Sequence, residues 1–172
     1  VLRFAERVWA DPTLVPNAIG ADLTRLSFLF TRLPGQAFPV FWTAAPADAP
    51  LVVAWAGGPD ARALSGVPVD ELARRAIDTL GALFGSPPGR LAAALRSAHA
   101  HDWLGDPFSR GAYTYLAVGG DAAPAALAAP LDDTLFFAGE ATDVAGDSGT
   151  VHGAIATGIR AAGQVIASLR AP

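Results

Sequence analysis

The sequence predicts a mixed α/β (α+β) fold, because strand patterns and helix patterns follow one another along the chain. Three short runs rich in aromatic and branched residues are separated by proline and glycine, which is typical of adjacent strands. A helical stripe of apolar residues follows them, and a long helix rich in small residues ends the chain. Apolar residues make up 52% of the 172 residues and charged residues 16%, so the chain can form a folded core.

The three predicted strands are residues 26–31, 38–43 and 51–56. Pro34-Gly35 and the proline-rich stretch 46–50 lie between them, which predicts a meander of neighbouring strands. Residues 1–4 also have the composition of a strand, and neither a turn nor a cap precedes them. A chain that begins inside an element is expected of a fragment or of one product of processing.

A helix is predicted over residues 70–84, with Asp70 as its N-cap and Gly85 just beyond its end. The sequence of residues 91–97 is compatible with either a helix or a strand. For residues 95–101 we favour a strand. The apolar positions that share one face of the predicted helix are Leu72, Ala73, Ala76, Ile77, Leu80, Leu83 and Phe84.

The C-terminal part is predicted to hold strands at 111–118 and 134–138, the second of them buried. Residues 121–130 have the composition of an alanine- and proline-rich linker, and residues 150–169 that of a helix. This helix contains Gly153, Gly158 and Gly163, each costing about 1 kcal/mol relative to alanine. The usual reason for such glycines is close approach of the backbone to a sheet or a ligand.

Composition excludes several classes of function. The net charge is −4 and the basic residues are scattered, so neither nucleic acid nor an anionic membrane is expected as a partner. There is no cysteine, all twelve basic residues are arginine, and no membrane span or secretory signal is visible. We therefore expect a cytoplasmic protein without lysine Schiff-base chemistry. His99, His101 and His152 show no zinc spacing, so no metal site is predicted.

An acidic residue follows the apolar run 135–138. Gly139 and Glu140 would lie at the carboxyl end of a strand, where open α/β sheets bind cofactors. A carboxylate there accepts hydrogen bonds from the sugar hydroxyls of a dinucleotide cofactor, although a helix cap or a salt bridge is an equally available role. The chain lacks a glycine-rich loop for the phosphates, so the sequence predicts part of a cofactor site.

The predicted C-terminal helix begins near Thr150 and Val151. Free N–H groups and the positive end of the dipole suit a ring system that becomes anionic on reduction. The alternative is that Thr150 is an ordinary N-cap.

Two aromatic residues, Trp103 and Tyr113, flank a turn. They are either core aromatics or walls of a substrate cavity, and aromatic faces suit an amine. Asp106-Pro107 has turn chemistry, and Arg110 is placed to pair with Asp106.

Three segments together resemble the C-terminal third of the flavin-containing amine oxidases, nearest to the branch of polyamine oxidases and lysine-specific histone demethylases. They are WLGDPFSRGAYTY, LFFAGEAT and GTVHGAIATGIRAAGQVI. VLRFAERVWAD, FPVFW and VVAWAGG resemble the family's substrate-domain sheet. The resemblance implies a two-domain fold. Residues 1–120 would belong to a mixed-sheet substrate domain with helices, 121–130 would be a linker, and 131–172 would be the C-terminal strand and helix of a Rossmann-like FAD domain.

The resemblance also implies roles for the site residues. Glu140, with Gly139, would contact FAD, and the backbone of Thr150 and Val151 would contact the flavin ring. Trp103 would lie beside the isoalloxazine, and Tyr113 would form one wall of an aromatic substrate cage. Monoamine oxidases usually have a second tyrosine where Thr150 stands, which favours the polyamine-oxidase-like branch.

Two parts of the family's cofactor site are missing from the sequence: the glycine fingerprint that binds the FAD pyrophosphate and the lysine near flavin N5. We expect a second polypeptide, or a removed N-terminal portion, to carry both. The activity implied is oxidation of a small amine at a C–N bond, by hydride transfer to the flavin and reoxidation by O₂ to give H₂O₂. The alternatives are an L-amino acid oxidase, with Arg25, Arg32 or Arg62 for the substrate carboxylate, and a non-catalytic binding or structural chain.

Overall fold

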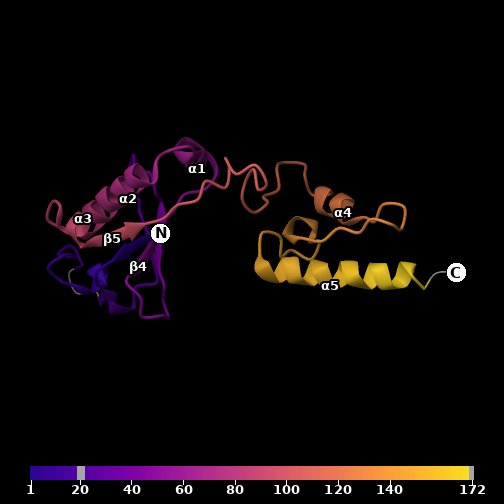
Figure 1. Cartoon of the computed structure of the whole chain (residues 1–172), viewed down its shortest axis with the longest axis horizontal. Coiled ribbons are helices and arrows are strands. Elements are labelled where there is room, and N and C mark those ends of the chain that lie inside the picture. Colours follow the sequence, from indigo (N-terminus) through magenta and orange to yellow (C-terminus); the bar gives the residue numbers. More distant parts are fainter. Residues whose placement is uncertain (19–21, 171–172) are drawn as a thin grey trace. The chain divides into compact units, whose positions relative to one another are not determined.

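The computed structural model describes residues 1–18 and 22–170. The chain forms two compact units, residues 1–110 and residues 111–172 (Figure 1). Their assignment to a substrate domain and a cofactor domain stays a prediction.

The first unit is built on a five-stranded sheet with the order β2-β3-β4-β1-β5. The predicted meander is confirmed, because the three predicted strands are neighbours and antiparallel. All the described strand pairs are antiparallel, so the mixed sheet implied by the family resemblance is not what these strands form. The strands are β1 (Leu2–Phe4), β2 (Phe28–Phe30), β3 (Val40–Thr43), β4 (Leu51–Trp55) and β5 (Leu95–Ala98).

Strand β1 lies between two partners although it starts at the second residue of the chain. Leu2 is paired with Val52 of β4 on one side and with Ala98 of β5 on the other. The strand predicted at residues 1–4 is therefore confirmed, and it is an interior strand of this sheet.

The predicted helix is α2 (Val69–Phe84), whose apolar face supplies core residues of the first unit. Leu80 is 1% exposed, in the same buried cluster as Phe4 and Phe41. Gly85 ends the helix at φ 69°, as predicted. Asp70 is not the N-cap, because the helix already begins at Val69 after Pro68, whose φ of −57° suits helix entry. The Asp70 carboxylate lies in the first turn of α2, where its negative charge interacts favourably with the positive end of the helix dipole.

Two shorter helices complete the first unit. Helix α1 (Gly58–Leu64) was not predicted, although Pro59 in its first turn is a helix-start signal. The segment 91–97 contains both predicted structures, since α3 (Arg90–Ala94) runs directly into β5.

The second unit contains α4 (Ala123–Ala128), the 3₁₀ turn η3 (Glu140–Thr142) and α5 (Val151–Ser168), and so confirms the predicted C-terminal helix. Residues 111–118 form no strand, and α4 lies inside the predicted linker. The predicted buried strand at 134–138 is also wrong. Only an isolated bridge joins Leu131 and Leu135, and Leu135 is 52% exposed. A buried strand needs paired neighbours, and the described residues provide none here.

No helix in the described ranges has the length and apolar character needed to cross a bilayer.

We expect Leu80→Ala to lower the unfolding free energy of the first unit by about 2–5 kcal/mol, since it leaves a cavity in the core. Leu33→Ala is the matched control, because Leu33 is 40% exposed; its cost should be about 0.5 kcal/mol or less. Denaturant unfolding followed by tryptophan fluorescence measures both, and equal losses would contradict the assigned core.

Candidate cofactor and substrate site

The side chain of Glu140 joins three segments of the second unit. Its Oε1 accepts a hydrogen bond from the Thr114 N–H at 2.9 Å, and its Oε2 accepts one from the Gly149 N–H at 2.7 Å. Tyr113, Glu140 and Thr150 are thereby brought to one place, although the sequence separates them. Of the predicted site residues, these lie close together in the second unit.

Gly139 connects this cluster to α5. Its backbone has φ 132°, a conformation that favours glycine. Its N–H donates to the Thr157 hydroxyl at 3.0 Å, and that hydroxyl lies 2.8 Å from the Ala154 carbonyl to which it donates. Thr157 is 3% exposed, so this hydrogen bond is shielded from water.

The face of α5 that packs within the second unit carries small residues, Gly153, Thr157 and Ala161. A Cβ on Gly153 would collide with the Asp147 carbonyl, so this glycine permits close approach to the loop before α5 and not to the predicted sheet or ligand. The same explanation does not extend to Gly158 and Gly163, where a Cβ would meet nothing within 4 Å among the described residues.

The start of α5 offers hydrogen-bond donors. The Thr150 hydroxyl accepts from the Gly153 N–H at 3.0 Å, which confirms Thr150 as N-cap. The N–H groups of Val151 and His152 lie in the first turn, where the helix supplies no acceptor. The Ser148 Oγ nearby is buried and has no hydrogen-bond partner in the described structure. Sequence patterns did not single out Ser148.

Tyr113 lies beside this helix start and is 58% exposed. Its Cδ2 is 3.6 Å from the position that a Cβ on Gly149 would take, and Gly149 has φ 77°. An exposed aromatic side chain thus borders the donors at the beginning of α5.

A second carboxylate, Asp143, shapes the loop that leads into α5. Asp143 is 5% exposed, and its Oδ2 accepts N–H bonds from Ala145, Gly146 and Asp147 at 3.1, 2.9 and 2.7 Å. The His152 Nε2 lies 3.1 Å from the exposed Asp147 carboxylate, within hydrogen-bond distance. Asp143 was missed, although an aspartate opening a turn is a recognisable signal.

Arg160 joins further segments of the second unit. Its Nη2 donates to the Phe137 carbonyl at 3.0 Å and to the Thr142 hydroxyl at 2.9 Å. Its Nη1 donates to the Ala128 carbonyl at 3.1 Å, which connects α4 to α5. The sequence did not predict these contacts, because an arginine within a helical pattern is usually exposed to solvent.

Trp103 belongs to the first unit, and the Glu140 cluster belongs to the second. Trp103 is 56% exposed, and its ring meets the His101 ring edge-on with centroids 4.2 Å apart. Asp106 forms the expected turn, but its side-chain partner is His101 at 3.1 Å, and the expected pairing with Arg110 is a backbone hydrogen bond.

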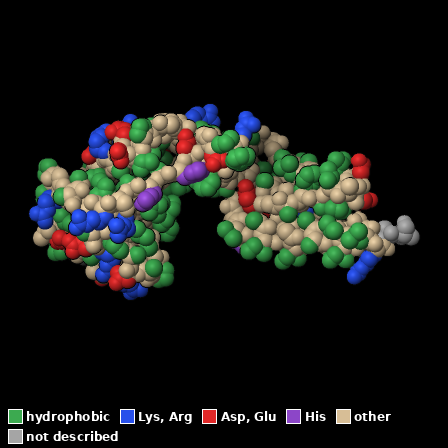
Figure 2. All heavy atoms as spheres, viewed as in Figure 1, with side chains coloured by type: hydrophobic (Ala, Val, Ile, Leu, Met, Phe, Trp, Pro, Cys, Tyr) green, Lys and Arg blue, Asp and Glu red, His purple; other side chains and the backbone are tan. Residues whose placement is uncertain are grey.

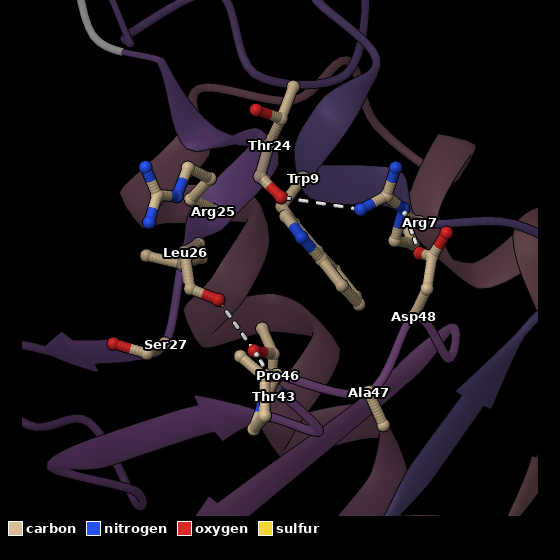
Figure 3. Close-up of a pocket in the computed structure, with 11 residues that line it drawn as sticks. Arg7, Trp9, Thr24, Arg25, Leu26, Ser27, Thr43, Pro46, Ala47 and Asp48 are labelled. Atoms are coloured by element: carbon tan, nitrogen blue, oxygen red, sulfur yellow. Dashed lines mark hydrogen bonds and ion pairs between the residues drawn. The ribbon is translucent and has the colours of Figure 1, made fainter.

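Arg25 lines a hollow of about 560 Å³ in the first unit (Figure 3). Arg7 and Trp9 also line it, and the Arg7 Nε lies 3.0 Å from Asp48. The hollow lies where β1 ends and β4 begins. Because β1 and β5 are antiparallel, the loop carrying Trp103 leaves the sheet at the opposite end. Arg25 is therefore separated from Trp103 by the length of the sheet.

The other two candidate arginines lie nearer the Trp103 end of the sheet. Arg62 is in α1, which follows β4, and Arg32 follows β2, which runs in the same direction as β4. Both are exposed, and no described contact joins either of them to Trp103.

One sheet face carries an aromatic cluster that the sequence analysis did not identify. Phe28 lies 6.4 Å from Phe30 and 6.1 Å from Trp42 between ring centroids. Phe28 and Phe30 are 59% and 67% exposed. The alternation of Phe28 and Phe30 was visible, but the register that pairs Phe28 with Trp42 was not.

The described residues contain no group of three or more His, Asp or Glu side chains placed to hold a metal ion.

The chain matches the model of the flavin containing amine oxidoreductase family over residues 1–166. It therefore belongs to this family of flavin-dependent oxidoreductases, as the resemblance indicated.

The curated relatives include plant and animal proteins. Lysine-specific histone demethylase 1 homolog 3 of Arabidopsis thaliana is 36% identical over 99% of this chain and 10% of its own length. FLOWERING LOCUS D of the same plant is 34% identical over 78% of this chain and 17% of its own length. A possible lysine-specific histone demethylase 1 of Drosophila melanogaster is 31% identical over 78% of this chain and 16% of its own length. The chain thus spans less than a fifth of these relatives.

We expect Thr157→Val to destabilise the second unit by about 1–3 kcal/mol, because it leaves the partly buried Gly139 N–H without its acceptor. Thr134→Val is the control, since Thr134 is exposed and water replaces its hydroxyl contacts. Hydrogen exchange at the Gly139 amide measures the effect. If Thr157→Val left the protection of the Gly139 amide unchanged, the predicted role of the Thr157 hydroxyl would be wrong.

Proposed function

We propose that this chain supplies the substrate side and the C-terminal cofactor side of an FAD-dependent amine oxidase. The observation that carries the proposal is the convergence of Tyr113, Glu140 and the start of α5 through two hydrogen bonds to one carboxylate. Family membership supports a flavin, and the two-domain organisation of the family is part of this proposal.

The donors and acceptors in this cluster fit part of FAD. Each Glu140 oxygen accepts one described backbone hydrogen bond and retains a lone pair for a cofactor hydroxyl. The Ser148 hydroxyl and the first-turn amides of α5 are donors suited to the polar edge of the ring. The sequence holds no glycine-rich phosphate loop, so the fit covers the sugar-alcohol and ring portions.

FAD, when bound, supplies the two-electron acceptor for oxidising the amine C–N bond, and O₂ returns it to the oxidised form with release of H₂O₂. Glu140 holds cofactor hydroxyls while it fixes residues 114 and 149. The start of α5 would stabilise the negative charge of the reduced flavin by about 0.3–1 kcal/mol. A contribution of this size adjusts the redox potential of the flavin but does not account for catalysis. Tyr113 and, in the first unit, Trp103 are assigned to walls of the substrate cavity. No side chain of this chain is required as a general base.

A partner segment is part of the proposal. The outer face of α5 carries an apolar stripe in which Val151, Ile155 and Ile159 are 78%, 61% and 71% exposed. Figure 2 shows hydrophobic side chains along this unit with few charged ones. Leu135 and Phe137 are also exposed, at 52% and 41%. Strands that pair with residues 134–138, from a segment carrying the glycine fingerprint and the lysine, would cover these surfaces.

The substrate class is an amine whose α C–H is oxidised. The names of several relatives specify lysine demethylation, which makes an N-methylated lysine side chain one substrate to test beside polyamines. Peroxide release across methyl-lysine peptides, polyamines and L-amino acids distinguishes an amine oxidase from an amino acid oxidase.

We predict that Glu140→Gln weakens FAD retention about ten- to a hundred-fold, because a hydrogen bond to a charged group contributes about 1.5–3 kcal/mol. The measurement is the flavin absorbance that remains after dialysis of the flavin-loaded protein. Asp121→Asn removes an exposed charge from the same unit and is the control. Flavin retention equal to the control would reject the cofactor role of Glu140.

We predict that Ile159→Glu reduces association with the segment that carries the glycine fingerprint, since it places a charge on the apolar stripe. Ala156→Glu is the control, because Ala156 is exposed on α5 outside the stripe. Co-purification of the two polypeptides, or flavin content if one polypeptide carries both, measures the effect. Equal loss in both variants would argue against the stripe as the contact surface.

A further inference from the structure

Asp102 precedes Trp103 and fixes the loop that carries it. Its Oδ2 accepts hydrogen bonds from the Ser65 hydroxyl at 2.7 Å and from the Gly66 N–H at 2.9 Å. Its Oδ1 accepts from the N–H groups of Leu104 and Gly105 at 3.1 and 3.0 Å. One carboxylate therefore ties the residues that follow α1 to the backbone that follows Trp103.

Gly105 is adapted to this arrangement. A Cβ at this position would lie 2.8 Å from the Asp102 Oδ2, so a larger residue would displace the carboxylate. The tight turn and the carboxylate thus depend on each other.

A second carboxylate acts on the side chain of Trp103 through a histidine. The Asp106 Oδ1 accepts the N–H groups of Phe108 and Ser109, both at 2.9 Å, and its Oδ2 lies 3.1 Å from the His101 Nε2. The His101 ring meets the indole edge-on at 4.2 Å. The indole is therefore supported on one side although it is 56% exposed.

We infer that Asp102 and the His101–Asp106 pair are positioning residues, which hold the exposed indole of Trp103 in the orientation needed for a wall of the amine cavity. The inference rests on the proposed function, and it assigns a specific task to three side chains. Asp102 sets the backbone of Trp103, and His101 limits the rotation of its ring. Neither residue needs to touch the amine.

The protonation state of Asp102 suits this task. The hydrogen bond from the Ser65 hydroxyl, followed by those from the Gly105 and Gly66 amides, lowers the pKa of Asp102 below its ordinary value. The contribution of these bonds is complete above the unfolded pKa of about 3.9 and is lost as the pH falls through the lowered value. At neutral pH the loop is held in full.

A double-mutant cycle separates positioning of Trp103 from general support of the fold. The variants are Asp102→Asn, Trp103→Phe and both together, made in the flavin-loaded protein with its partner segment. We expect Asp102→Asn to raise the KM for the amine about tenfold with a smaller effect on kcat, since misplaced cavity walls weaken productive binding. In the Trp103→Phe background the same substitution should change KM less than about twofold, because contacting residues are not additive.

Two further variants complete the kinetic test. Ser65→Ala removes one donor and should shift KM in the same direction by a smaller factor, which keeps the test decisive if Asp102→Asn does not fold. Asp60→Asn, an exposed charge on α1, should leave KM unchanged. A KM increase of equal size with and without Trp103 would overturn the inference.

A spectroscopic measurement tests the same inference without activity. The emission of Trp103 is obtained as the difference between each variant and its Trp103→Phe counterpart. Asp102→Asn and Asp106→Asn should lower the anisotropy of this emission and increase its quenching by acrylamide. If neither substitution changed the anisotropy of the Trp103 emission or its quenching by acrylamide, the inference would be overturned. If the parent protein oxidises no amine, the proposed function fails, and the emission still decides whether these residues orient Trp103.

Discussion

The carboxylate of Glu140 accepts backbone hydrogen bonds from residues 26 positions before it and 9 positions after it. These two bonds bring Tyr113 and the start of α5 to the same place, in a unit that has no described sheet. The carboxylate satisfies two amides that no ladder pairs, so it substitutes locally for regular structure. The candidate cofactor site depends on this one side chain more than on any strand.

One face of helix α5 packs within the second unit, and the other face is exposed to solvent. The face with Thr157 closes onto Gly139 and the η3 turn, and its small residues permit that approach. The face with Ile155 and Ile159 stays exposed to water. Burial of such an apolar stripe stabilises a protein by about 25 cal/mol per Å². The second unit therefore holds its own loops in place with one face of α5 and leaves the apolar stripe on the other face exposed.

Carboxylates that accept backbone N–H groups recur in both units. Asp102 and Asp106 organise the Trp103 loop, and Asp143 organises the loop before α5. Each one fixes irregular backbone beside a residue that the family resemblance assigns to substrate or cofactor. Loops held in this way keep exposed aromatic side chains in defined places without burying them. That arrangement suits a site that must stay open to a ligand.

Local sequence patterns predicted much of the secondary structure of this protein. The meander, helix α2, helix α5 and the Thr150 cap follow from periodicity and capping, because these signals depend on neighbours in sequence. The run 135–138 was misassigned because a strand requires partners that a local pattern does not reveal. The motifs indicated that Glu140 and Tyr113 belong to a site and identified the family. Only the tertiary structure decided that Glu140 binds two backbone amides, that His101 takes the expected place of Arg110 beside Asp106, and that Asp102 anchors the Trp103 loop. Those contacts join residues far apart in the chain, so they exist only once the chain has folded.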